Sequence, residues 1–179
     1  MIHLMINFRL LAGHGAIVAH GSRYRGYLFG ILAYYMSDAL WGILAGLNWT
    51  CALYIDTIFF FLSLVVFVFM WSRFACAYLR LSKFTSRLIA GFGYALLLGN
   101  IIAIVANIFN NCLFYFDAKG TYLLGPVRLH SFACLVCYGS LIPLIVLFKV
   151  LAKREPFNGR NLTVFVNSIT MTVAVALCR

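Results

Sequence analysis

Long apolar runs separated by short polar gaps form the dominant pattern of the chain. A membrane-spanning helix needs about 20 mostly apolar residues, and five runs reach or approach that length. They cover residues 27–47, 51–71, 88–109, 129–151 and 162–178, and the last run is short. The pattern predicts an all-α, integral membrane helical bundle of about five transmembrane helices over residues 27–179. Residues 1–26 are expected to form a cytoplasmic or interfacial N-terminal segment.

The gaps between the runs carry their own signals. Residues 48–50 leave room only for a tight connection, so the first two helices should pack as an antiparallel pair. The gap at residues 110–128 contains an Asp-Ala-Lys-Gly turn signal between aromatic residues, which predicts either a short hairpin or an aromatic lid at the membrane interface. Residues 2–19 are apolar but interrupted, and we expect a surface-lying segment there, with an additional span as the alternative.

Composition supports a membrane protein. Hydrophobic residues make up 64% of the chain, charged residues 10%, and the mean hydropathy is +0.98, whereas soluble domains carry about 25% charged residues. The bilayer is therefore the first expected partner.

The formal net charge of +10 is distributed at the ends of the apolar runs. Eleven of the 14 basic residues fall on one side of the predicted topology: Arg9, Arg23, Arg25, Arg73, Arg80, Lys83, Arg87, Lys149, Lys153, Arg154 and Arg160. The positive-inside rule makes that side cytoplasmic, which predicts a multi-pass protein of the plasma membrane with its N-terminus inside. The charge thus indicates topology, and no nucleic-acid partner is expected.

No catalytic or metal-binding signature is present in the sequence. The six cysteines lie mostly in apolar surroundings, and the Cys134–Cys137 pair has no second ligand pair at zinc spacing. We find no nucleophile triad, phosphate-binding glycine loop or zinc-protease motif. An enzyme is not expected, nor is a cofactor or a metal site.

Acidic residues at membrane depth are the main functional candidates. The chain has only four acidic residues, and Asp38 and Asp56 fall inside predicted spans, where a carboxylate costs about 2.5–3.5 kcal/mol to insert. Asp38 shares a helix face with Tyr34 and Trp41 and is expected near the midplane; Asp56 lies closer to the outer surface and is expected to be hydrated. They are candidates to anchor a cationic or hydroxylated ligand, or a proton.

Asn100 and Asn107 share a face of the third predicted helix with Asn111. They are further candidates for ligand binding or coupling. The alternative for these asparagines, and for Ser63, is purely structural hydrogen bonding between helices.

Five stretches together resemble a known sensory module. They are Tyr34–Gly42 (YYMSDALWG), Leu53–Thr57 (LYIDT), Trp71–Leu79 (WSRFACAYL), Phe116–Tyr122 (FDAKGTY) and Gly125–Arg128 (GPVR). The pattern resembles the N-terminal multi-helix membrane input module of Firmicute-type bacterial signalling proteins, where it precedes diguanylate cyclase or histidine kinase domains. The resemblance implies a sensor that passes a signal to an output domain. The chain lacks a clear first span and ends before a returning helix, which predicts a truncated receptor without its own output domain.

Three functions are therefore open. The leading prediction is a membrane sensory module that responds to a small-molecule or proton signal, with a homodimer or a separate signalling output protein as partner. The second is a small transporter or channel-like subunit that uses Asp38 for proton or cation coupling. The third is a structural interaction subunit with no ligand.

Overall fold

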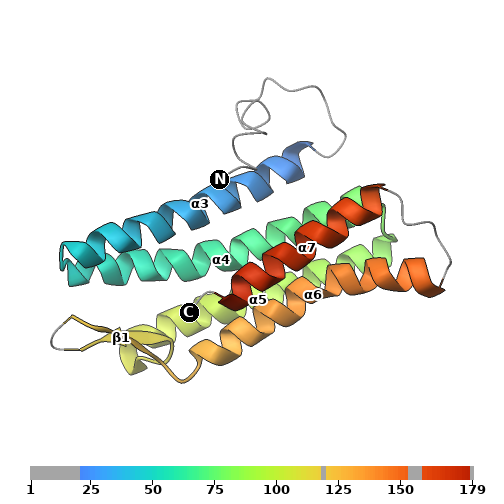
Figure 1. Cartoon of the computed structure of the whole chain (residues 1–179). Coiled ribbons are helices and arrows are strands. Elements are labelled where there is room, and N and C mark those ends of the chain that lie inside the picture. The colour runs from blue at the N-terminus through green and yellow to red at the C-terminus, as the bar shows by residue number, and fades with distance from the viewer. Residues whose placement is uncertain (1–20, 118–119, 153–158, 178–179) are drawn as a thin grey trace.

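A computed structural model describes residues 21–117, 120–152 and 159–177. Within these ranges the chain forms five helices and one two-stranded hairpin, and each helix runs antiparallel to the next (Figure 1). The elements are α3 (Gly21–Gly46), α4 (Thr50–Tyr78), α5 (Lys83–Asn110), β1 (Phe114–Phe116), β2 (Tyr122–Leu124), α6 (Arg128–Ala152) and α7 (Gly159–Leu177). Residues 2–19, predicted as a surface segment, lie outside the described ranges.

The bundle has two chemically different ends. We call one the hairpin end, because α3 ends there beside the β1–β2 hairpin (Figure 1). We call the other the basic end, because most described basic residues lie on the helix segments and the α4–α5 turn nearest to it: Arg23, Arg25, Arg73, Arg80, Lys83, Arg87 and Lys149.

The all-α bundle and its multi-pass character are confirmed. Four helices, α3 to α6, are long and apolar enough to cross a membrane. The fifth helix, α7, coincides with the last and shortest of the predicted runs, and its described apolar part covers Asn161–Ala176. The helices also extend beyond the apolar runs: α4 continues to Tyr78 and α5 begins at Lys83. Arginine and lysine are good helix formers, so the change from apolar to basic sequence does not end a helix.

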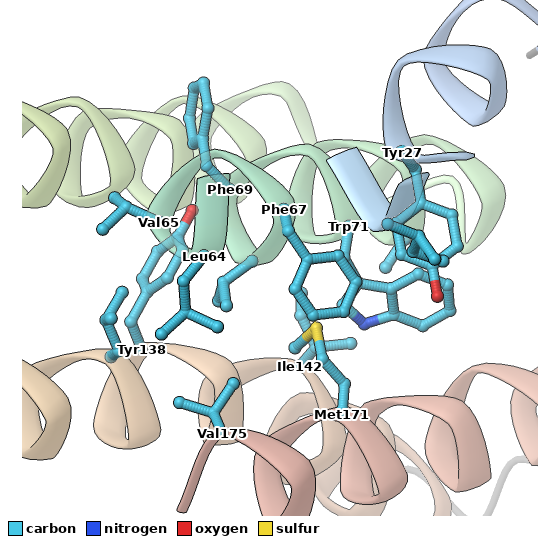
Figure 2. Packing of buried hydrophobic residues seen from close by; sticks show 14 of the residues in the cluster. Tyr27, Leu64, Val65, Phe67, Phe69, Trp71, Tyr138, Ile142, Met171 and Val175 are labelled. Atoms are coloured by element: carbon cyan, nitrogen blue, oxygen red, sulfur yellow. The ribbon is translucent and has the colours of Figure 1, made fainter. Parts of the chain in front are cut away.

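Helix α4 is the centre of the bundle and contacts α3, α5, α6 and α7. Figure 2 shows its side chains packed against those of α6 and α7, with Trp71 and Met171 among them. Its core residues Leu64, Val65 and Val68 are at most 1% exposed. The bundle is therefore closed by close-packed apolar side chains, whose dispersion contacts add up over many atoms.

Both predicted connections are present. Asn48, with φ of 55°, takes the left-handed conformation that commonly ends a helix, and the Trp49 amide donates to the Leu44 carbonyl at 3.2 Å. The β1–β2 hairpin confirms one of the two alternatives for residues 110–128. Its turn uses Gly120 at φ 79° and an Asp117 carboxylate that accepts from the Thr121 amide at 2.7 Å.

Candidate functional site

Two polar contacts join α3 to α4 in the half of the bundle nearest the hairpin. The Ser37 hydroxyl lies 3.1 Å from Asp56 Oδ1 and 3.2 Å from the Asp56 carbonyl oxygen, to which it donates. The Trp41 indole N–H donates to the Thr57 hydroxyl at 3.3 Å. Ser37 is 1% exposed and Asp56 5%. Asp56 Oδ2 is buried and has no hydrogen-bond partner within the described part of the chain.

The burial of the two aspartates is the reverse of the prediction. Asp56 was expected to be hydrated and is buried between helices, whereas Asp38, expected to be buried, is exposed. The reason is helical geometry: Ser37 and Leu44, seven residues apart, face α4, and Asp38 lies about 100° further round the helix. Asp38 faces a cavity instead.

That cavity has a volume of about 230 Å³ and lies at the meeting point of four elements. Its lining consists of Asp38 and Trp41 from α3, Thr57 and Phe60 from α4, Tyr122 from β2, and Arg128 from α6. We call it the hairpin-end cavity. It combines one carboxylate, one guanidinium, hydroxyl groups and aromatic walls, as polar small-molecule sites commonly do.

Arg128 is buried to an unusual degree for a charged residue, with 8% of its surface exposed. Its guanidinium donates to the Tyr122 hydroxyl and lies 5.3 Å from the ring centroids of Tyr122 and Phe132. Burial raises the pKa of the Tyr122 phenol, although the nearby Arg128 charge opposes that rise, so Tyr122 remains a neutral acceptor at ordinary pH. Among the described residues no carboxylate contacts Arg128. A buried cation held only by neutral groups favours the approach of an anion.

Asn107 has a structural part in this site. It is 0% exposed, and its Oδ1 accepts from the Leu113 amide at 2.6 Å and the Phe114 amide at 3.1 Å. Its Nδ2 donates to the Phe114 carbonyl at 3.0 Å and contacts the Tyr54 hydroxyl at 3.4 Å. Asn107 therefore fastens the hairpin to α5 and thereby helps to position Tyr122.

Asn100 and Ser63 bond within their own helices rather than between helices. Asn100 Nδ2 donates to the Leu96 carbonyl at 3.0 Å, and the Ser63 hydroxyl donates to the Phe60 carbonyl at 2.9 Å. Neither Asn100 nor Asn107 lines the hairpin-end cavity. The structure therefore does not bring these two asparagines together with Asp38.

Tyr34 is also separate from Asp38 and Trp41. Its ring packs against Phe60 and Phe67, and it lines a second, largely apolar cavity of about 370 Å³ between α3, α4 and α7. Of the six predicted site residues, the structure brings only Asp38 and Trp41 into the hairpin-end cavity. Asp56 does not line it, but its neighbour in the sequence, Thr57, does.

Sequence reasoning missed four lining residues and one buried partner: Thr57, Phe60, Tyr122 and Arg128, and Ser37. A signal existed for Arg128, because basic residues are scarce on the hairpin side of the predicted topology and this one begins a span. The sequence gives no such signal for Ser37, Thr57, Phe60 and Tyr122, since hydroxyl and aromatic residues are common throughout the chain.

Comparisons with models of protein families, with curated proteins and with solved structures found no match. The resemblance to a sensory input module therefore stays a prediction, and function has to be argued from the site itself.

Proposed function

We propose that this chain is a sensory module of the plasma membrane that binds a small polar ligand in the hairpin-end cavity. The observation that carries the proposal is the lining of the cavity: Asp38 and Arg128 have opposite charges and come from different helices. A ligand that contacts both bridges α3 and α6, and its binding shifts the balance between helix arrangements.

The chemistry of the lining limits the ligand. The Arg128 guanidinium suits a carboxylate or phosphate, Asp38 suits an ammonium or hydroxyl group, and the Trp41 face favours a cation. A cavity of about 230 Å³ lies below the roughly 300–1,000 Å³ of drug-sized sites. We therefore expect a metabolite of amino-acid size that carries an anionic group together with a cationic or hydroxyl group.

The α3–α4 contact offers a way to transmit occupancy. The indole N–H of Trp41, which lines the cavity, is bonded to Thr57 of α4. A ligand that takes either group as its own partner weakens this bond and changes how α3 sits on α4. With the N-terminus cytoplasmic, as the basic residues predict, that change reaches the cytoplasm at the start of α3, where a second copy or a separate output protein receives it.

A transporter is the second candidate, because Asp38 is a carboxylate that lies within a candidate membrane span and lines a cavity. The packing of the bundle argues against it. Phe61, Leu64 and Val68 fill the centre and are at most 2% exposed, so a path to the basic end requires the core to repack.

Tryptophan fluorescence of the full chain in lipid nanodiscs tests the proposal. Amino acids and related zwitterions are titrated in, and at least one is expected to change the emission and raise the unfolding temperature. Trp41→Phe should abolish the emission change, whereas Trp49→Phe should retain it, because Trp49 is 63% exposed and lies outside the cavity.

Asp38→Asn and Arg128→Gln separate sensing from transport. Both should weaken ligand binding by about tenfold or more, the usual loss for a charged hydrogen bond. If the parent chain drives substrate flux in proteoliposomes and Asp38→Asn abolishes that flux, the transporter is favoured instead. Equal affinity in the parent and both variants would overturn the cavity as the binding site.

A further inference from the structure

The basic end contains two adjoining cavities between α3, α4 and α5, which we call together the basic pocket. Their volumes are about 180 and 340 Å³, and both are lined by Arg23, Cys76, Ser86 and Arg87. Arg73 lines the first and Arg80 and Lys83 line the second. Five cationic side chains, from three helices and the turn between α4 and α5, therefore surround one region of the surface.

The positive charge there has no acidic neighbour among the described residues. No carboxylate lines either cavity, and the three described aspartates, Asp38, Asp56 and Asp117, all lie towards the hairpin end. The first turn of α5 holds Lys83 and no acidic residue, so the positive end of the helix dipole adds to the field rather than being neutralised. Like charges held together in this way attract a counter-anion.

Topology alone does not account for this arrangement. The positive-inside rule explains why basic residues gather at one end of the bundle, but it does not require cations from different helices to line a common cavity, and Arg25 lines neither cavity. Arg80, with φ of 50°, takes the left-handed conformation that commonly ends a helix, and the turn that follows brings Arg80 and Lys83 into the same cavity as Arg23. Arg73 is also held in place, with its guanidinium 3.5 Å from the Tyr94 hydroxyl.

We propose that the basic pocket binds a phosphate group, carried either by an anionic phospholipid or by a soluble phosphorylated compound. Arginine forks and lysine ammonium groups are the side chains that recognise phosphate oxygens, and the Ser86 hydroxyl supplies a further donor. Basic pockets between spanning helices suit the headgroups of anionic lipids. This site lies at the opposite end from the hairpin-end cavity and does not depend on the function proposed for it.

Binding measurements on the full chain in detergent micelles, with two probes, test the inference. The lipid arm titrates fluorescent phosphatidylglycerol against fluorescent phosphatidylcholine, and the soluble arm titrates inorganic pyrophosphate by calorimetry. Arg87→Gln and Arg23→Gln should each lower the affinity for the probe that binds by about tenfold or more. Arg25→Gln is the matched control on α3 and should change affinity little, because Arg25 lies outside the pocket.

Each outcome decides the matter. If the parent chain prefers phosphatidylglycerol and Arg87→Gln removes that preference, the pocket binds the phosphate of a lipid headgroup. If the parent chain binds pyrophosphate and Arg87→Gln removes that binding, the pocket binds a soluble phosphorylated compound. If neither probe binds the parent chain, or if Arg25→Gln weakens binding as much as Arg87→Gln, the pocket is not a phosphate site. Unfolding temperatures without a probe confirm that the variants are folded, which is expected because Arg23, Arg25 and Arg87 are exposed.

Discussion

Replacing Asn107 with alanine should detach the β1–β2 hairpin from α5. Leu113 pairs with Gly125, whose amide donates to the Leu113 carbonyl at 2.9 Å, so Phe114 falls at a position of the ladder where its amide and carbonyl point away from β2. Asn107 satisfies both Phe114 groups and also the Leu113 amide. The Asn107 side chain thus makes the hydrogen bonds that a third strand beside β1 would make.

The expected cost follows from the number of groups that lose a partner. Three backbone groups become unsatisfied in residues that are 0% exposed, and each costs about 1–3 kcal/mol. The free energy of unfolding should therefore fall by at least about 3 kcal/mol. The fall is smaller only if the hairpin opens and water hydrates those three groups. In either case the Leu113 and Phe114 amides should exchange with solvent about 100-fold faster, since 1.4 kcal/mol corresponds to roughly a factor of ten.

Hydrogen exchange in micelles measures this effect, and Asn100→Ala is the matched control. Asn100 lies two turns earlier on α5 and is 5% exposed, but it bonds only to the Leu96 carbonyl of its own helix and has a buried Oδ1 without a partner among the described residues. Its replacement should change stability by less than about 1 kcal/mol. Unchanged exchange at Leu113 and Phe114 in Asn107→Ala, or equal acceleration in Asn100→Ala, would show that Asn107 does not hold the hairpin on α5.

Two further substitutions test the packing between helices. Gly93→Ala would place a Cβ 2.5 Å from the Tyr138 hydroxyl and should lower the free energy of unfolding by about 1–3 kcal/mol. The control is Gly99→Ala, whose Cβ meets nothing within 4 Å and which should have little effect. Equal thermal stability of the two variants would contradict the close packing of Gly93 against α6. Ser168→Ala removes the acceptor for the Trp71 indole N–H at 2.9 Å and leaves a buried donor unpaired, for about 1–3 kcal/mol of lost stability. Circular dichroism during heating measures both, and an unchanged melt of Ser168→Ala would show that this bond contributes nothing.

The elements of this fold were predictable where bilayer thickness or turn chemistry dictates them. Spanning helices follow from the length of apolar runs, and the Asp117–Gly120 turn signal predicted a hairpin as one of two alternatives, the one that the structure contains. Helix ends were less predictable, because α4 and α5 continue as helices past the apolar residues.

The composition of the site was much less predictable, because almost every face of a spanning helix is apolar. Nothing in the sequence around Ser37 shows that this serine, rather than its neighbour Asp38, faces α4. Asn107 could be noted as polar, but its partners are backbone groups of a hairpin, which no side-chain pattern reveals. Arg128 becomes informative only when its burial is known.

The distribution of directional contacts along α3 suggests how the two ends of the bundle differ in function. Ser37 and Trp41, in the hairpin half of α3, form side-chain hydrogen bonds to α4. The basic half is joined by ring packing, including Tyr27 at 4.8 Å between centroids from Trp71. A hydrogen bond constrains both a distance and an angle, whereas dispersion contacts between ring surfaces are less directional. On the proposed function, a ligand in the hairpin-end cavity therefore acts where the α3–α4 contact is most directional, and the opposite end of α3 reaches the basic pocket through Arg23.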